Sequence, residues 1–167
     1  MKHLKIIIAI VLASISIVSM RAGENDWHIY FSPTYYLNPL HRTSLQGGLI
    51  GFEKELTRRR MAGFAVVVRD PVLYNQGTFK KADYSLLGYY KPSIYLGKND
   101  NAYISFGGNL GSGAKGITFG LNLSLEYAYT FRNRVKLFIS QDNLLVFRTD
   151  NLLISGVSVG IKIPLTR

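Results

Sequence analysis

The chain has 167 residues, 47% of them hydrophobic, and it contains no cysteine. This composition excludes a disulfide framework and a lipid anchor attached through cysteine, so an exported protein with this sequence depends on its hydrogen-bonded ladder and its packing alone. The formal net charge of +10 favours anionic partners such as lipid phosphates or nucleic acid, but the charge is too dispersed along the sequence to identify either.

The first 22 residues have the pattern of a secretory signal peptide. Lys2 and Lys5 give a basic start, residues 6–18 are nearly all aliphatic but too few to span a bilayer comfortably, and Ala22 is a small residue at the exit. We therefore predict a signal peptide over residues 1–22 and one domain over residues 23–167. An uncleaved N-terminal anchor is the alternative.

After this segment, large apolar residues alternate with small or polar ones almost throughout. A period of two predicts extended strands, and Gly, Asn, Asp, Pro or basic residues mark the turns between them. In chain order, we predict strands over residues 26–37, 43–56, 61–69, 82–96, 102–110, 116–131, 135–142 and 153–164. Residues 143–151 form either a loop or an extension of the neighbouring strands.

Two early strands contain residues that disturb the pattern. Pro33 lies inside the first strand and lacks the backbone donor of a ladder, so we expect a bulge or irregularity there. In the second strand, several glycines leave the assignment of the two faces open. Ile50 and Leu56 favour one lipid-facing side, which would turn Glu53 and Glu55 inward.

The strand over residues 116–131 is the most regular. Its odd positions from Ile117 to Phe131 are all large and apolar, whereas its even positions are small or polar, and a helix would scatter the apolar residues around its circumference. A strand of a soluble domain usually has ~5–6 residues, whereas a tilted membrane-spanning strand needs ~9–11. Aromatic residues crowd one end, as in an interfacial girdle. The pattern favours a transmembrane barrel over a soluble sandwich or lipocalin-like barrel.

The predicted fold is all-β: an eight-stranded antiparallel up-and-down transmembrane β-barrel in the outer membrane of a Gram-negative bacterium. No apolar run after residue 22 approaches the length of a transmembrane helix, and a closed barrel satisfies every backbone group in lipid. With both termini in the periplasm, the second, fourth and sixth connections should be short. The polar stretches 57–60, 97–101 and 132–134 fit this rule, whereas residues 111–116 form a predicted flexible loop that is shorter than expected.

Charged residues of both signs share the predicted inward faces. An unpaired charge inside a narrow barrel loses hydration without compensation, and an eight-stranded interior is only wide enough for side chains to fill. We therefore interpret these residues as a structural ion-pair network; a substrate site built on Glu126 with Lys136 or Arg69 is the alternative. The predicted network comprises Glu53, Glu55, Arg69, Asp83, Lys91, Glu126, Lys136 and Lys162.

No catalytic, cofactor or metal motif is recognisable in the sequence. A barrel hydrolase or acyltransferase needs a nucleophile beside a base, usually His, and residues 23–167 contain only His28 and His41, in no catalytic spacing. There is no glycine-rich phosphate loop and no metal-ligand spacing. We predict a non-enzymatic protein without a cofactor, without a small-molecule substrate and without direct nucleic-acid contact.

The densest basic run is Arg58, Arg59 and Arg60, on a predicted periplasmic turn. These residues could contact a phosphate-bearing or acidic partner protein. A solvated turn near lipid headgroups, where basic residues are favourable in any case, is the simpler explanation.

Four stretches of the second half carry a family resemblance. They are Gly120 with Leu-Ser-Leu-Glu-Tyr at 123–127, Arg-Val-Lys-Leu-Phe-Ile-Ser-Gln at 134–141, Leu-Val-Phe at 145–147 with Thr-Asp at 149–150, and Ser-Gly-Val-Ser-Val-Gly-Ile at 155–161. From residue 47 onward, and most clearly over residues 117–163, the chain resembles the TraO family of conjugative-transposon proteins.

The resemblance implies an outer-membrane component of a mating apparatus that moves DNA between Gram-negative cells, in contact with outer-membrane lipids and with other transfer proteins. The alternatives are a generic small outer-membrane barrel, either structural or a lipid-modifying enzyme, and a soluble periplasmic lipid-binding barrel.

Overall fold

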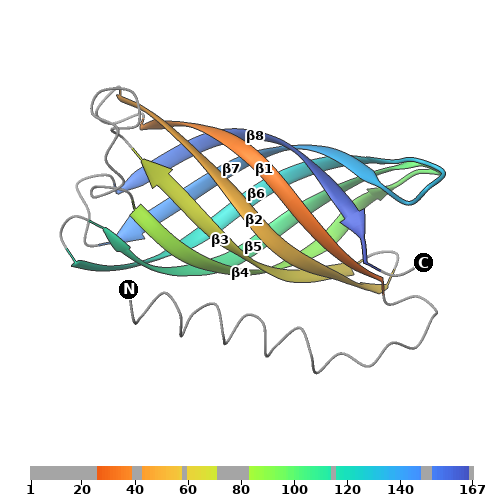
Figure 1. The fold of residues 1–167 in the computed structure, drawn as a ribbon, viewed down its shortest axis with the longest axis horizontal. Coiled ribbons are helices and arrows are strands. Elements are labelled where there is room, and N and C mark those ends of the chain that lie inside the picture. Colours follow the sequence, from red (N-terminus) through yellow and green to blue (C-terminus); the bar gives the residue numbers. More distant parts are fainter. Residues whose placement is uncertain are drawn as a thin grey trace.

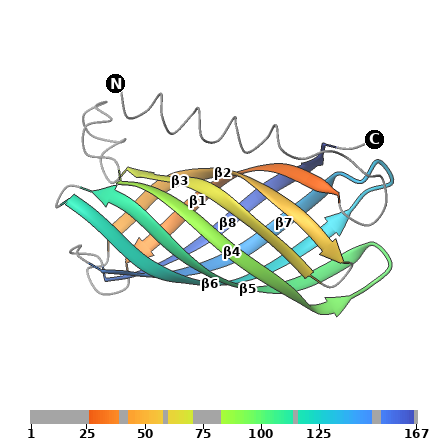
Figure 2. The same cartoon turned by 90° about the horizontal axis from the view of Figure 1, so that it is seen from below.

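A computed structural model describes residues 26–38, 43–57, 60–70, 83–113, 116–147 and 152–165. In these ranges the chain forms a closed antiparallel barrel in which each strand pairs with its neighbours in sequence and the last pairs with the first (Figures 1 and 2). The predicted eight-stranded up-and-down barrel is confirmed. The strands are β1 (Trp27–Asn38), β2 (Thr43–Thr57), β3 (Arg60–Asp70), β4 (Asp83–Leu96), β5 (Asp100–Gly113), β6 (Gly116–Thr130), β7 (Lys136–Phe147) and β8 (Leu153–Pro164).

The predicted signal peptide over residues 1–22 lies outside the described residues. In the part of the chain that the structure does describe, no helix is long and apolar enough to cross a membrane.

The two ends of the barrel differ in their connections. We call the end that holds Trp27 and Leu165, which are joined by a backbone hydrogen bond of 2.7 Å, the terminal end. The connections after β2, β4 and β6 lie at this end and have two to five residues, as predicted. The odd-numbered strands end at the opposite end, where β3 and β4 are separated by twelve residues of sequence and β5 and β6 by two.

Two strands extend further than predicted. Residues 111–113 belong to β5 and pair with the start of β6, because Ser112 stands opposite Ile117 and Gly113 opposite Gly116. The expected flexible loop is therefore mostly strand. Gly116 has φ of 105°, a conformation that glycine adopts without steric cost at the end of this hairpin. Strand β7 continues to Phe147, so most of the stretch left open between loop and strand is strand.

No bulge forms at Pro33, but the expected irregularity is present as a gap in the β1–β8 pairing, in which Ser32 and Pro33 have no partner on β8. Pro33 pairs with Gly48 of β2, and the register between β1 and β8 is the same before and after it. The Ser32 hydroxyl donates a hydrogen bond of 3.0 Å to the carbonyl of Val159, the residue that faces Pro33 in this register. This side-chain bond supplies the donor that proline lacks, so the ladder needs no extra residue. Register shifts occur instead at Glu55/Thr57 and at Ser93/Tyr95.

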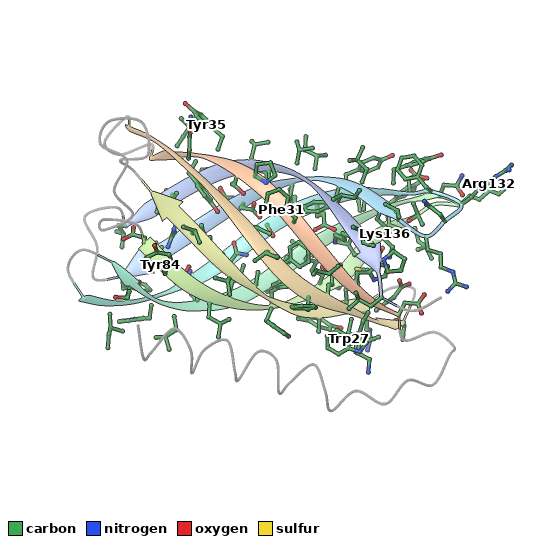
Figure 3. All side chains as sticks on the ribbon, viewed as in Figure 1. Trp27, Phe31, Tyr35, Tyr84, Arg132 and Lys136 are labelled. Atoms are coloured by element: carbon green, nitrogen blue, oxygen red, sulfur yellow. The ribbon has the colours of Figure 1, made fainter. Side chains whose placement is uncertain are left out.

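The barrel has an apolar outside and a polar inside. Leu121 and Val159 expose 60% and 50% of their surface, whereas Glu126 and Lys162 expose 4% and 0%. Large side chains project from the wall along its whole length (Figure 3). The alternation of the strands thus turns most large aliphatic residues outward and places charges in the lumen. A smaller set of aliphatic residues is buried inside: Val67, Leu87, Leu144, Val146 and Ile154.

Aromatic rings also enter the lumen, and a glycine makes room for each of four of them. In every case the glycine is the direct cross-strand neighbour of the ring, and a β-carbon added to it would lie 2.5–2.8 Å from a ring or hydroxyl atom. These aromatic–glycine pairs are Tyr30 with Gly51, Tyr89 with Gly63, Phe138 with Gly160 and Tyr36 with Gly156.

Candidate functional site

Four charged side chains meet in the lumen, one from each even-numbered strand. Lys91 Nζ lies 2.6 Å from a carboxylate oxygen of Glu53 and 2.6 Å from one of Glu126. Lys162 Nζ lies 2.7 Å from the other oxygen of Glu53 and 2.5 Å from the other oxygen of Glu126. We call these residues the lumen quartet. Its two positive and two negative charges sum to zero, and each ammonium group bridges both carboxylates.

Aromatic side chains surround the lumen quartet. The Tyr89 hydroxyl lies 3.1 Å from Glu53 and 2.8 Å from the Tyr30 hydroxyl. Lys91 Nζ lies 4.6 Å from the centre of the Tyr89 ring, and Lys162 Nζ lies 4.9 Å from the centre of the Phe138 ring. Each ammonium therefore has carboxylates and the face of a ring as neighbours, an arrangement that compensates for lost hydration.

A polar layer centred on Asp142 adjoins the quartet on the side of the opposite end. Asp142 accepts hydrogen bonds from Ser158 at 2.7 Å and from Ser140 at 3.2 Å, and the hydroxyls of Ser158 and Thr34 lie 2.8 Å apart. The cavity between this layer and the quartet has a volume of about 30 Å³. That volume suits one water molecule. The lumen at this level therefore offers no room for a substrate.

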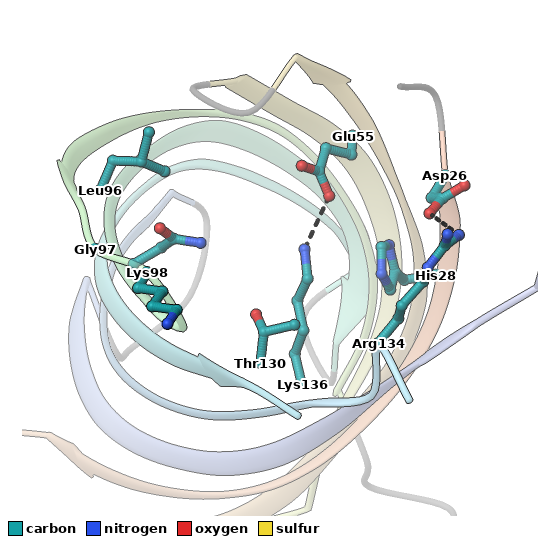
Figure 4. Close-up of a pocket in the computed structure, with 10 residues that line it drawn as sticks. Asp26, His28, Glu55, Leu96, Gly97, Lys98, Thr130, Arg134 and Lys136 are labelled. Atoms are coloured by element: carbon teal, nitrogen blue, oxygen red, sulfur yellow. Dashed lines mark hydrogen bonds and ion pairs between the residues drawn. The ribbon is translucent and has the colours of Figure 1, made fainter. Parts of the chain in front are cut away.

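A larger cavity of about 400 Å³ opens at the terminal end. Lys136 reaches across it and pairs with Glu55 at 2.9 Å (Figure 4). Arg134 and Asp26 pair at 3.2 Å on its rim, where both are in contact with solvent. His28 lines the cavity, is 1% exposed, and its Nδ1 has no hydrogen-bond partner among the described residues.

The structure brings the predicted charged residues together in two groups. Glu53, Lys91, Glu126 and Lys162 form the quartet, and Glu55 and Lys136 form a separate pair at the mouth. The alternative centred on Glu126 expected Lys136 or Arg69 beside it, but its ion-pair partners are Lys91 and Lys162.

The remaining charges of the predicted network lie towards the opposite end. Arg69 and Asp83 stand directly opposite each other on β3 and β4. Arg69 is buried, and its Nε and Nη1 have no hydrogen-bond partner within the described ranges.

Of the predicted basic turn, only Arg60 is described; it is exposed and begins β3. Arg58, Arg59 and His41 lie outside the described residues, so a partner contact of the basic run stays a prediction. Asp142 is missing from the predicted lumen network because the seventh strand was predicted to end at this residue. The alternation that runs on through Leu144 and Val146, both buried, would have placed it inward.

No group of three or more His, Cys, Asp or Glu side chains that could hold a metal ion occurs among the residues with described positions.

No protein-family model matches the chain. A search of curated proteins finds no significant match either. The TraO resemblance therefore stays a prediction.

Solved structures with a similar fold include the crystal structure of Ail, the attachment invasion locus protein of Yersinia pestis. It has a TM-score of 0.51 and 10% sequence identity, over 85% of this chain and 98% of that chain. A second crystal structure of Ail, in complex with the heparin analogue sucrose octasulfate, has a TM-score of 0.47 and 11% identity, over 84% of this chain and 98% of that one. At such identities the first likeness concerns the fold alone: this chain is a closed eight-stranded β-barrel similar to Ail.

Proposed function

We propose that this protein is a non-enzymatic integral barrel of the outer membrane of a Gram-negative bacterium, which holds its connecting segments at the two membrane surfaces and does not conduct solutes. The observation that carries the proposal is the exposed apolar surface of the outer wall. Large hydrophobic side chains that are 37–64% exposed cover it on every strand except β3. Soluble monomers rarely expose contiguous apolar patches larger than a few hundred Å².

The placement of aromatic residues supports the same proposal. Tyr35 and Tyr84 lie towards the opposite end of the barrel, and Trp27 lies at the terminal end (Figure 3). Tyr129 and Phe131 also lie at the terminal end, with their ring centres 5.2 Å apart. Aromatic girdles at both lipid–water boundaries are typical of outer-membrane barrels.

The lumen quartet supports the non-conducting part of the proposal. A solute crossing the barrel would have to displace ion pairs of 2.5–2.7 Å between fully buried groups. Because breaking such pairs leaves charges without hydration, the closed state is strongly favoured. The role of the lumen quartet is therefore structural: it fills the interior and holds the surrounding strands in place.

The test is fractionation followed by a transport assay. We expect the protein to stay in outer membranes washed with high salt and alkaline carbonate, to require detergent for extraction, and to migrate differently on gels before and after boiling. Vesicles containing it should not swell in sugar solutions. Release by salt alone would overturn the membrane placement, and rapid swelling would overturn the closed lumen.

We further propose that the barrel acts in conjugative DNA transfer. The support is the sequence resemblance, whose matched stretches fall mainly on β6, β7 and β8, three adjacent strands of one wall, while its Thr-Asp pair at 149–150 lies outside the described residues. DNA would not pass through so narrow a lumen, so the role would lie in partner contacts of the connections.

A donor strain lacking the gene should transfer DNA at a strongly reduced frequency, restored by the gene in trans. Affinity purification of the tagged barrel should recover other transfer proteins. Normal transfer from the deletion strain, with no transfer protein recovered, would remove this finer proposal and leave the membrane barrel intact.

A lipid-modifying activity is the less favoured alternative. It requires a polar cluster at the outer interface, whereas His28 is buried inside the mouth at the terminal end. Unchanged lipid composition after replacement of both His28 and His41 would dispose of it.

A further inference from the structure

Three outward polar residues interrupt the apolar wall near its middle: Gln141 and Asn143 of β7 and Ser155 of β8. Gln141 lies halfway along β7 and faces outward between Leu125 and Val157, its direct neighbours on β6 and β8. Both neighbours are about half exposed on the same outer face. Other outward polar residues of the described strands, such as Gln46, Lys54 and Ser112, lie near strand ends, where the membrane surface would hydrate them.

The Gln141 amide differs from its polar neighbours in having no bond of its own. Asn143, two residues further along β7, accepts a hydrogen bond of 2.9 Å from Ser155, and its amide group approaches the Leu123 carbonyl at 3.5 Å. No side-chain hydrogen bond holds Gln141 in the described part of the chain. An amide without a partner in hydrocarbon loses several kcal/mol relative to water, so a barrel standing alone in lipid is penalised at this position.

The wall around Gln141 is hollow. A shallow depression of about 420 Å³ lies beside it, and the outward side chains that line it include Ile94, Tyr127, Ile139 and Val157. The register shift between Ser93 and Tyr95 lies next to this depression. A neighbouring molecule could therefore place apolar side chains in the hollow while it approaches the amide.

We propose that two copies of this chain associate side by side in the membrane through the outer face of β7, with the two Gln141 amides hydrogen-bonded to each other. Two barrels inserted in the same direction are related by a two-fold axis along the membrane normal. A residue at that axis meets its own copy at the same depth. A primary amide carries both a donor and an acceptor, so two facing glutamines can form reciprocal N–H···O=C bonds.

A second copy fits better than the other occupants. Lipid chains could fill the hollow, but they offer no hydrogen bond to the amide. A different protein would need a matching donor and acceptor at this depth, whereas the same chain supplies them by symmetry. The inference rests on the proposed membrane placement, and it adds a specific partner and a specific contact.

The absence of cysteine allows a direct test in native outer membranes. Gln141→Cys is treated with copper phenanthroline and compared with Val66→Cys, an outward position at the middle of β3 on the other side of the barrel. We expect a band of twice the monomer mass for the first variant and little for the second. Ile139→Cys, on the same face, retains the Gln141 amide, and we expect it to give the stronger dimer band of the two β7 reporters.

Gln141→Leu gives the complementary measurement. Loss of the amide pair should weaken the dimer roughly tenfold in detergent sedimentation experiments. Equal cross-linking at positions 141 and 66, or adducts of another mass only, would overturn the proposal. Resistance of each variant to salt extraction and its heat-dependent gel mobility report the membrane barrel separately, so failure of the dimer and failure of the proposed function are distinguishable.

Discussion

Replacement of Glu53 by Gln should be among the most damaging conservative changes in this barrel. Gln has nearly the same shape as Glu and keeps an acceptor for the Tyr89 hydroxyl, so packing is unchanged. What changes is the charge. Glu53 binds Lys91 at 2.6 Å and Lys162 at 2.7 Å, and all three side chains are buried. Without it, two buried ammonium groups share the single carboxylate of Glu126.

Removal of one partner of a buried ion pair usually costs ~3–5 kcal/mol of unfolding free energy. Because Glu53 serves two lysines, we expect a loss towards the upper end, about 4–5 kcal/mol. The matched control is Glu55→Gln, since Glu55 has one ion-pair partner, Lys136, and is partly exposed at the mouth. Its loss should be about 1 kcal/mol or less.

The assay is equilibrium unfolding by urea or guanidinium in lipid vesicles, followed by the heat-dependent gel shift. The double variant Glu53→Gln with Lys162→Met restores neutrality, leaves the Lys91–Glu126 pair, and should recover most of the lost stability. A loss of less than about 1 kcal/mol for Glu53→Gln, or no recovery in the double variant, would refute the charge-balance explanation.

Three further substitutions have defined outcomes in the same unfolding assay. Gly160→Val should lower the free energy of unfolding by ~1–3 kcal/mol, because its β-carbon would meet the Phe138 ring. Gly88→Val, with open space around the added β-carbon, should be tolerated. Similar losses of stability in the two variants would contradict this explanation. Arg134 has φ of 63°, a strained angle for a residue with a β-carbon. Arg134→Gly should therefore leave the free energy of unfolding unchanged or raise it, whereas Arg134→Val should lower it by about 1–2 kcal/mol. The reverse order would exclude backbone strain at this position. Ser32→Ala should cost ~1 kcal/mol because it leaves the Val159 carbonyl without its donor, and no change would show that water replaces the hydroxyl.

The architecture was predictable because the alternation is nearly unbroken. A period of two fixes which residues share a face, and the apolar character of the larger residues predicts which face of the barrel wall turns outward. The inward direction of Glu126 and Lys162 follows directly from their phase with Leu121 and Val159.

The pairing of the charges could not be predicted in the same way. The alternation shows whether a residue points into the lumen. It does not show the position of that residue along the barrel axis, which depends on strand tilt and stagger. Lys136 and Lys162 are direct cross-strand neighbours, yet one pairs with Glu55 at the mouth and the other with Glu53 in the quartet. Likewise, the compensation of Pro33 depends on a hydroxyl meeting a carbonyl across the β1–β8 seam, which the sequence alone does not reveal.

The aromatic–glycine pairs have a consequence for how the barrel closes. A shift of two residues is the smallest slip that keeps every strand's inner face turned inward. Such a slip between β1 and β2 would set Tyr30 against Glu53 or Leu49 in place of Gly51, and the ring would collide with a β-carbon. The pair of Tyr36 with Gly156 imposes the same condition where the first and last strands join. The aromatic–glycine pairs therefore select one register between neighbouring strands. In that register the rings can enter the lumen and the barrel can close.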